Sequence, residues 1–234
     1  MPEIEIISDI RETLELLEGI MSTNKKSECL IGLRRDFIEG YEREGAVDSW
    51  PPQPPRIIYG MRKVLDAKDI LVSDVGTCKL WAAKFYPVYR NNTFVLSNGF
   101  ASMGFALPTA IVAKLIHPEQ NVVALCGDGG FMMNLQDLET ACRLKLNVVV
   151  VIFNDNAYNL IKWKSEKKFG TSFGISYTNP DFVKLAESFG AVGIRLESSN
   201  EFENVLREAL SKSVPVIIDV PIDYSNNEII YNLL

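Results

Sequence analysis

Residues 122–158 of the chain read VVALCGDGGFMMNLQDLETACRLKLNVVVVIFNDNAY, and this stretch decides the fold. It opens with an apolar run that is typical of a buried strand and turns at residues 127–130, GDGG. A segment with helical spacing follows, and a second apolar run ends at residues 154–156, NDN. Strands that run parallel bring their carboxyl ends together, and ligands bind at that edge of open α/β sheets. The pattern therefore predicts that Asp128 and Asp155 lie together at a ligand-binding edge.

The two acidic turns suit a metal-bound diphosphate. Mg²⁺ is commonly held by one or two carboxylates together with phosphate oxygens of a ligand. The glycines beside Asp128 let the backbone approach a phosphate, which the N-terminus of the following helix also attracts. A GDG turn alone is a weak signal, and the alternative is that Asp128 and Asp155 only cap helices. The second acidic turn favours the ligand site.

The rest of the chain repeats this alternation of strand and helix. Apolar runs predict strands at residues 70–73, 94–96, 122–126, 148–153, 192–196 and 216–220. Helical spacing predicts helices at residues 79–86, 103–116, 135–144, 157–168, 180–189 and 201–211. Pro180 fits the first helical position, and Gly190 fits the end of that helix. The order predicts an α/β fold, a doubly wound parallel sheet with helices on both faces.

The N-terminal region has a different pattern. Apolar side chains recur there at helical spacing, at Ile10, Leu14, Leu17 and Met21. They predict an amphipathic helix from about Asp9 to Ser22, and a polar, charged stretch follows. The PPQPP segment at residues 51–55 is interpreted as a semi-rigid connector, because proline does not continue a helix. We therefore expect residues 1–50 to be the tail of a preceding domain plus a linker, and residues 51–234 to be the ligand-binding domain.

Composition excludes several other classes of protein. The net charge of −6 argues against a nucleic-acid partner, and the lysines of residues 162–168 are expected on a solvated helix face. We expect no membrane association, because no apolar stretch is long enough to span a bilayer and the acidic start is no signal peptide. The four cysteines lack CxxC spacing, which favours reduced thiols and a cytoplasmic location. His117 is the only histidine, and we expect it to have a structural role. A Ser-His-Asp triad is therefore not expected.

Five stretches carry a resemblance to a known family. Residues 127–156 resemble the cofactor motif of thiamine diphosphate (ThDP) enzymes, which opens with GDG and closes with an Asn- or Asp-containing turn. A resemblance to acetolactate synthase, especially its catabolic, flavin-independent branch, is carried by residues 97–108, 138–145, 186–191 and 216–225. An Asp rather than an Asn at position 155 also resembles the catabolic branch. The resemblance implies the cofactors ThDP and Mg²⁺. It also implies a transferase, a carboligase that condenses two pyruvates to 2-acetolactate with loss of CO₂, in branched-chain amino acid or acetoin metabolism.

The resemblance also implies roles for particular residues. Asp128, Asp155 and the carbonyl of Ala157 match the metal ligands. Met103 matches the bulky residue beneath ThDP that keeps the cofactor bent, the alternative being a core methionine. The other expected cofactor contacts are Gly76, Thr77, Cys78, Ala101, Gly127, Gly129, Gly130, Asn154 and Tyr158. Thr77 and Cys78 depart from the family, which often has Ser or Gln followed by His. Lys164 stands where the branches have Gln or Trp, which leaves the acceptor substrate open.

The resemblance covers the chain from about Trp50 to Ser225, so we expect a fragment or a separately encoded part of a larger enzyme. In the family a pyrimidine-binding domain of another subunit supplies the activating glutamate, and no matching motif occurs here. The chain alone is therefore expected to be inactive on pyruvate. Self-association, as a homo-oligomer and specifically a dimer, is expected to cover an apolar face at Phe100, Met103, Phe105, Leu160 and Trp163.

Two alternatives stay open. The chain could be the cofactor domain or subunit of another ThDP-dependent decarboxylase or carboligase that acts on a different 2-keto acid. It could also be a non-catalytic nucleotide-binding or structural α/β module that shares only the turn. The sequence has neither a GxxxxGK[ST] stretch nor a GxGxxG after its first strand, which argues against the two commonest nucleotide-binding modules.

Overall fold

A computed structural model describes residues 5–20 and 28–231, and the chain divides into two compact units, Met1–Glu39 and Gly40–Leu234. In the first unit, α1 spans Ile10–Ile20 and confirms the predicted amphipathic helix as far as the described residues reach. Met21 and Ser22 lie outside them. The carboxylate of Asp9 begins this helix by accepting from the amide of Arg11 at 2.9 Å. Helix α2, Glu28–Gly45, was not predicted and crosses from one unit into the other.

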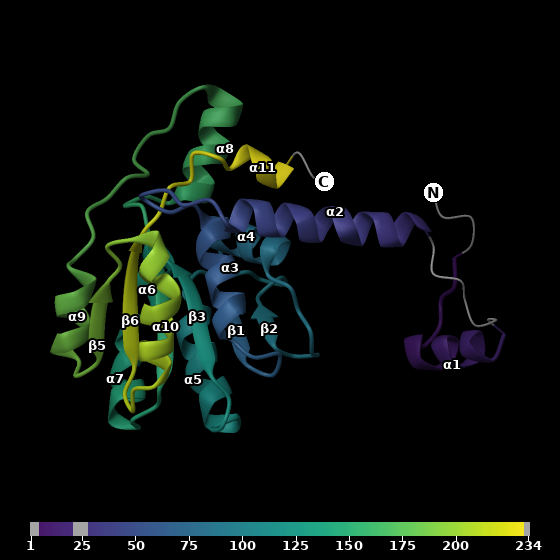
Figure 1. Cartoon of the computed structure of the whole chain (residues 1–234), viewed down its shortest axis with the longest axis horizontal. Coiled ribbons are helices and arrows are strands. Elements are labelled where there is room, and N and C mark those ends of the chain that lie inside the picture. Colours follow the sequence, from purple (N-terminus) through teal and green to yellow (C-terminus); the bar gives the residue numbers. More distant parts are fainter. Residues whose placement is uncertain (1–4, 21–27, 232–234) are drawn as a thin grey trace. The chain divides into compact units, whose positions relative to one another are not determined.

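The second unit is built on a parallel sheet of six strands in the order β2-β1-β3-β4-β6-β5 (Figure 1). The strands are β1 Ile70–Ser73, β2 Phe94–Leu96, β3 Val122–Gly127, β4 Val148–Asn154, β5 Val192–Arg195 and β6 Val216–Pro221. All six predicted strands are confirmed, and no end differs by more than one residue. Every pair of neighbouring strands is parallel, so all carboxyl ends meet at one edge.

Helices cover both faces of the sheet, which confirms the predicted doubly wound α/β fold. One face packs against α3 Pro54–Val64, α4 Thr77–Phe85 and α10 Phe202–Leu210. The other packs against α5 Ala106–Ile116, α6 Asp128–Met133, α7 Leu138–Arg143 and α9 Phe182–Ser188. Short 3₁₀ turns at Leu135–Asp137 and Ser199–Glu201 precede α7 and α10. Helices α8 Asn159–Phe169 and α11 Glu228–Tyr231 lie beyond the carboxyl ends of the strands (Figure 1).

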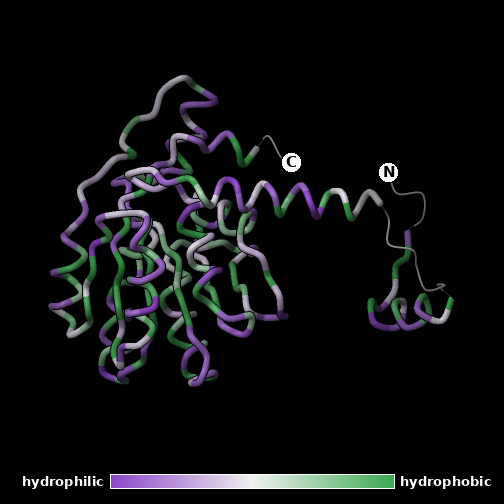
Figure 2. Tube along the Cα trace, viewed as in Figure 1, coloured by the Kyte–Doolittle hydropathy of each residue, from purple (hydrophilic) through white to green (hydrophobic). Residues whose placement is uncertain are grey.

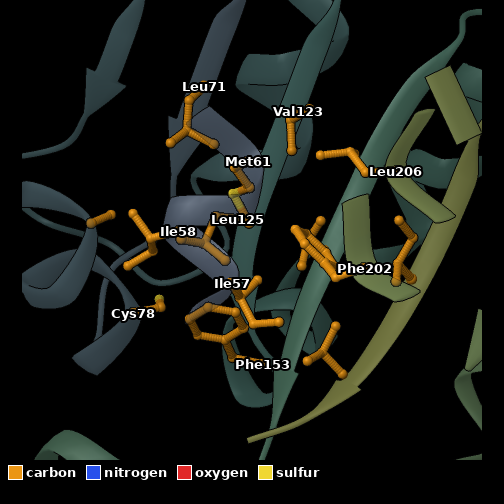
Figure 3. Close-up of a cluster of buried hydrophobic side chains, with 14 of the residues drawn as sticks. Ile57, Ile58, Met61, Leu71, Cys78, Val123, Leu125, Phe153, Phe202 and Leu206 are labelled. Carbon is orange, nitrogen blue, oxygen red and sulfur yellow. The ribbon is translucent and has the colours of Figure 1, made fainter. Parts of the chain in front are cut away.

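The core consists of two apolar layers, one on each face of the sheet. In β3, Val123 and Leu125 face α3 and α10, whereas Val122 and Ala124 face α5. All four are fully buried, as expected for parallel strands covered on both sides. Figure 2 shows the apolar residues running along these strands, and Figure 3 shows the side chains of the first layer. This core holds the strand ends rigidly in register.

The interpretation of residues 51–55 as a connector was wrong at its end, because α3 begins at Pro54. Proline is tolerated in the first helical turn, where its missing N–H has no intrahelical partner. The apolar side of α3 is fully buried and consists of Ile57, Ile58 and Met61 (Figure 3). Arg56 also forms two hydrogen bonds with the carboxylate of Glu203 on α10, at 2.8 and 2.9 Å. Pro54 and Pro55 are therefore buried in the first turn of a core helix and do not belong to a spacer.

Other helix boundaries also differ from the predictions, and α4 begins two residues earlier, at Thr77, while α8 begins two residues later, at Asn159. Helix α9 begins at Phe182 because Asp181 caps it, so the prediction for Pro180 was wrong by two positions. Gly190 follows the end of this helix at a φ of 85°, as predicted. Helix α5 begins at Ala106 and not at residue 103, and the predicted helix 135–144 is a 3₁₀ turn followed by α7.

The second compact unit begins at Gly40, earlier than the expected boundary at residue 51. Tyr41 contacts Tyr59 with ring centroids 5.1 Å apart, and Asp48 accepts from the side-chain amide of Asn200. Residues 40–50 thus pack within this unit. The assignment of residues 1–39 to the tail of a preceding domain stays a prediction.

Among residues 5–20 and 28–231, no helix is both long enough and apolar enough to cross a membrane.

Candidate functional site

A cavity of about 260 Å³ lies at the carboxyl ends of β1, β3 and β4. It lies beside the point where the chain order reverses, since β1 has β2 on one side and β3 on the other. Open α/β sheets bind ligands at such a reversal. The lining contains all the predicted site residues except Asn154, and adds Val75, Asn159, Leu160, Ile161 and Tyr224.

Three helices begin at this cavity, α4 at Thr77, α6 at Asp128 and α8 at Asn159. The first amide N–H groups of a helix have no intrahelical partner, and the helix dipole adds positive potential there. Gly76, just before α4, has a φ of 137°, which side chains rarely allow. The cavity is therefore suited to an anion bound largely by backbone groups.

Asp128 is 1% exposed, and its carboxylate is surrounded by donors. The shortest hydrogen bonds to Oδ2 come from Asn179 Nδ2 at 2.6 Å and the amide of Asn156 at 2.7 Å. Five groups donate to this carboxylate, the amides of Gly129, Asp155 and Asn156 and the side chains of Tyr177 and Asn179. Both carboxylate oxygens accept from these donors, so the arrangement fixes the orientation of the group.

Asp155 has a different environment. Its Oδ2 accepts from Asn159 Nδ2 at 2.8 Å. Burial, and then the negative charge of Asp128, raise the pKa of Asp155 to about 7. A hard divalent cation between the two carboxylates would relieve both effects. The described residues contain no cluster of three His, Cys, Asp or Glu side chains, so the remaining ligands would be carbonyl and phosphate oxygens. The donor set fits Mg²⁺ bound with a diphosphate.

Asn159 connects Asp155 to the opposite side of the cavity. Its Oδ1 accepts from Thr77 Oγ1 at 3.2 Å and from Asn227 Nδ2 at 2.9 Å. The indole N–H of the buried Trp81 in turn donates to Asn227 Oδ1 at 2.8 Å. Sequence reasoning missed both asparagines. The position of Asn159 at the start of a helix after an acidic turn was a usable signal, whereas nothing in the sequence pointed to Asn227.

Tyr177 and Tyr158 pack over the first acidic turn with ring centroids 4.8 Å apart. Tyr177 Oη donates to Asp128 Oδ1 at 2.7 Å, and burial followed by this hydrogen bond raises the pKa of Tyr177. The phenol therefore stays a donor. A Cβ at Gly129 would lie 2.7 Å from Tyr177 Oη and 2.8 Å from the Tyr158 ring, so only glycine fits there. Tyr177 was missed because it comes from a loop after α8.

Asp74 organises the loop that carries Ala101 and Met103. It is fully buried, and its carboxylate accepts from the amides of Gly104 at 3.0 Å and Ala106 at 3.1 Å. Burial raises the pKa of Asp74. Ala101 adopts a φ of 57°, a conformation that non-glycine residues adopt mainly where the surroundings impose it. Sequence reasoning missed Asp74, although an acidic residue at the end of a strand is the same signal that identified Asp128.

The side chains of three predicted contact residues are engaged within the protein or buried. Asn154 does not line it, because its amide bonds to Asp219 at 2.9 Å. The Thr77 hydroxyl donates to Asn159. The Cys78 thiol is 1% exposed, and burial raises its pKa to about 12. Binding through the backbone is what Thr77 and Cys78 can offer, and the roles of all three toward a cofactor stay predictions.

The chain belongs to the thiamine pyrophosphate enzymes, since the family model for the C-terminal TPP binding domain matches residues 74–220. It is similar to acetolactate synthase of Bacillus subtilis (strain 168), with 35% identity over 97% of this chain and 40% of that protein. It is also similar to the catabolic acetolactate synthase of Raoultella terrigena, with 34% identity over 100% of this chain and 43% of that protein. The chain thus spans less than half the length of these relatives.

A solved structure shares the fold. The thiamine diphosphate-dependent 4-hydroxybenzoylformate decarboxylase of Rhodococcus jostii RHA1 matches with a TM-score of 0.69 and 24% identity. The match covers 74% of this chain and 33% of that one. The resemblance to ThDP enzymes, and within them to acetolactate synthases, is confirmed, and the matched region is the ThDP-binding domain.

Proposed function

We propose that this chain is the ThDP- and Mg²⁺-binding part of an acetolactate synthase that condenses two pyruvates to 2-acetolactate with loss of CO₂. The observation that carries the proposal is the pair Asp128 and Asp155 at a cavity where three helices begin. Two carboxylates alone would repel a diphosphate. With a divalent cation between them, the same site attracts one, and the helix N-termini add donors. The similarity to acetolactate synthases supports the choice of reaction.

The residues have the following roles in this proposal. Asp128, Asp155 and the carbonyl of Ala157 hold the metal. The backbone of residues 76–78 and the N-terminus of α4 hold the diphosphate, while Ala101 and Met103 hold the organic rings. When bound, ThDP supplies the electron sink for loss of CO₂ from a 2-keto acid. The chain itself would orient the cofactor through the hydrogen bonds of Asp74, Asp128 and Asn159.

A second subunit or domain completes the site in this proposal. Phe100, which precedes Ala101 of the cavity lining, is 97% exposed, and Ile161, which lines the cavity, is 58% exposed. Such apolar side chains favour association, and we propose a homo-oligomer, specifically a dimer, together with a pyrimidine-binding domain supplied from elsewhere. The thiols of Cys78, Cys126 and Cys142 are free, which supports the proposed cytoplasmic location.

The test is a titration of the 234-residue chain with ThDP, with and without Mg²⁺, by calorimetry. We expect uptake only with the metal and no turnover of pyruvate until a pyrimidine-binding domain is added. Assaying both CO₂ and acetolactate after that addition separates acetolactate synthase from a simple decarboxylase, which would release acetaldehyde. No ThDP uptake at any Mg²⁺ concentration, with or without the added domain, would contradict the proposal.

A further inference from the structure

A chain of hydrogen bonds runs from Asp128 to the far side of the sheet. Asn179 Nδ2 donates both to Asp128 Oδ2 at 2.6 Å and to Asn154 Oδ1 at 2.9 Å. Asn154 Nδ2 then donates to Asp219 Oδ1 at 2.9 Å. Asp219 Oδ2 accepts from Arg195 Nε at 3.1 Å and lies 2.9 Å from Arg195 Nη2. The chain links β5, β6 and β4 to the first acidic turn.

We propose that Asn179, Asn154, Asp219 and Arg195 are positioning residues that set the orientation of the Asp128 carboxylate toward the metal. This inference rests on the proposed function, because it assigns Asp128 as a metal ligand. Ligands of metals are commonly oriented by such outer hydrogen bonds, whose loss costs about 10- to 100-fold in metal affinity.

The direction of each hydrogen bond is determined by the two carboxylates at the ends. Asp219 can only accept, so Asn154 must turn its NH₂ toward it and its oxygen toward Asn179. Asn179 must therefore direct its NH₂ to Asn154, and the same nitrogen reaches Asp128, which also only accepts. A reversed amide at either asparagine would place two donors or two acceptors face to face. The network thus allows one orientation of the two asparagine amides, with the NH₂ group of Asn179 directed at Asp128 Oδ2.

The anchor of the network is rigid. Asp219 lies within β6, is 1% exposed and is in register with Ile152 on β4, two residues before Asn154. A buried carboxylate needs a partner, and Arg195 at the end of β5 provides one. Arg195 also lies 3.4 Å from Asp181 Oδ1 at the start of α9, so it has a local structural contact as well. The experiment has to separate these two contributions.

Four variants make that separation, Asn179→Ala, Arg195→Met, Arg195→Lys and Arg56→Met. The last is a matched control, because Arg56 forms an equally well-defined ion pair with Glu203 at 2.8 Å on the opposite helical layer. For each variant, calorimetry gives the melting temperature and the Mg²⁺ concentration at half-maximal ThDP uptake. We expect Asn179→Ala to raise that concentration by about 10- to 100-fold and Arg195→Met by about tenfold. Arg195→Lys should restore it toward the wild-type value.

Arg56→Met should lower the melting temperature and leave the Mg²⁺ requirement unchanged. If Arg195→Met behaves in the same way as Arg56→Met, the Arg195 pair is only structural and the inference is overturned. If Asn179→Ala leaves the Mg²⁺ requirement unchanged, the network does not position Asp128, which also overturns it.

A second measurement needs neither ThDP nor metal. The side-chain amide resonances of Asn179 in ¹⁵N NMR should move in Arg195→Met and return in Arg195→Lys, since the network transmits the change through Asp219 and Asn154. Unchanged Asn179 resonances in Arg195→Met would overturn the inference. Absence of ThDP uptake by the wild-type chain would instead count against the proposed function, and the NMR result would still decide whether the network exists.

Discussion

Asp128 and Asp155 follow neighbouring parallel strands, and the protein surrounds their carboxylates in opposite ways. Asp128 accepts from five donors, whereas the side chain of Asp155 accepts from Asn159 and has its pKa raised to about 7 by burial and by Asp128. Hydrogen bonds from the protein itself hold the first carboxylate in place. The second has fewer such partners, and burial beside Asp128 disfavours its charged form. In the proposed metal site, the comparison teaches that Asp128 would set the position of the cation and that Asp155 would respond to its binding.

The largest effect is expected for Asp128→Asn. An amide there would turn an NH₂ group toward donors such as Tyr177 Oη or Asn179 Nδ2, leaving buried groups unpaired. At about 1–3 kcal/mol for each unsatisfied group, the free energy of unfolding should fall by roughly 3 kcal/mol. Metal-dependent ThDP uptake should also be lost. Urea unfolding and calorimetry measure the two effects, and unchanged ThDP affinity with Mg²⁺ present would exclude Asp128 as a ligand.

Asp155→Asn should have the opposite effect on stability. Because the pKa of Asp155 is about 7 in the folded chain and 3.8 for an ordinary Asp, the folded state binds more protons than the unfolded state between these values. The contribution of Asp155 to the free energy of unfolding is therefore largest below about pH 4 and is lost as the pH rises through about 7. The Asp155→Asn variant has no carboxyl group to ionise at this position, so it lacks this pH-dependent loss of stability. It should be more stable than wild type at pH 8 by on the order of 2 kcal/mol, after allowance for partial exposure of the group.

The pH series for Asp155→Asn also needs a control. Urea unfolding between pH 4 and 8 should show the two curves converging at the acid end. The exposed Asp66→Asn removes the same charge elsewhere and should leave the wild-type slope intact. An amide oxygen remains a hard ligand, so Asp155→Asn should keep metal-dependent ThDP uptake, unlike Asp128→Asn. Equal behaviour of the two variants would remove the distinction between the two turns.

Asn159→Ala should have a smaller effect on the free energy of unfolding. It tests the comparison of Asp128 with Asp155 by changing the surroundings of Asp155 and not those of Asp128. The change removes the hydrogen bond to Asp155 Oδ2 and leaves the Nδ2 of the buried Asn227 without its acceptor. We expect a loss of about 1–2 kcal/mol in the free energy of unfolding and about a tenfold higher Mg²⁺ requirement. Thr77→Val is the matched control, since it removes the other donor to Asn159 without touching Asp155. A larger effect in the control would assign the role of Asn159 to packing at α4.

The smallest effect on stability is expected for Met103→Ala, which lies in the same cavity but on neither turn. Met103 is half-buried, so truncation should cost under about 1 kcal/mol, well below the 2–5 kcal/mol typical of a fully buried methionine. ThDP affinity should fall nonetheless if the side chain supports the bent cofactor. Thermal unfolding and ThDP titration test both points, and a loss of several kcal/mol with unchanged ThDP affinity would favour a core role.

Local sequence patterns were sufficient to predict the strands, but they failed to predict helix starts that depend on tertiary packing. The apolar runs of β3 and β4 have one plausible partner arrangement, because parallel strands buried on both faces must be apolar throughout. Prolines gave the wrong indication at Pro54, which begins a helix, and at Pro180, which precedes one. Whether a proline ends or starts a helix depends on what packs against the following turn, and at α3 that partner is α10, far along the chain.

The sequence by itself determined the parallel sheet, the place of Asp128 and Asp155 at one edge of it, and most of the cavity lining. These follow from short-range periodicity and from the rule that parallel strands share their carboxyl edge. Only the tertiary structure decided which groups surround the two carboxylates. Asp74, Tyr177, Asn179 and Asn227 reach the site from separate loops, and their hydrogen bonds depend on distances and directions that no spacing along the chain encodes.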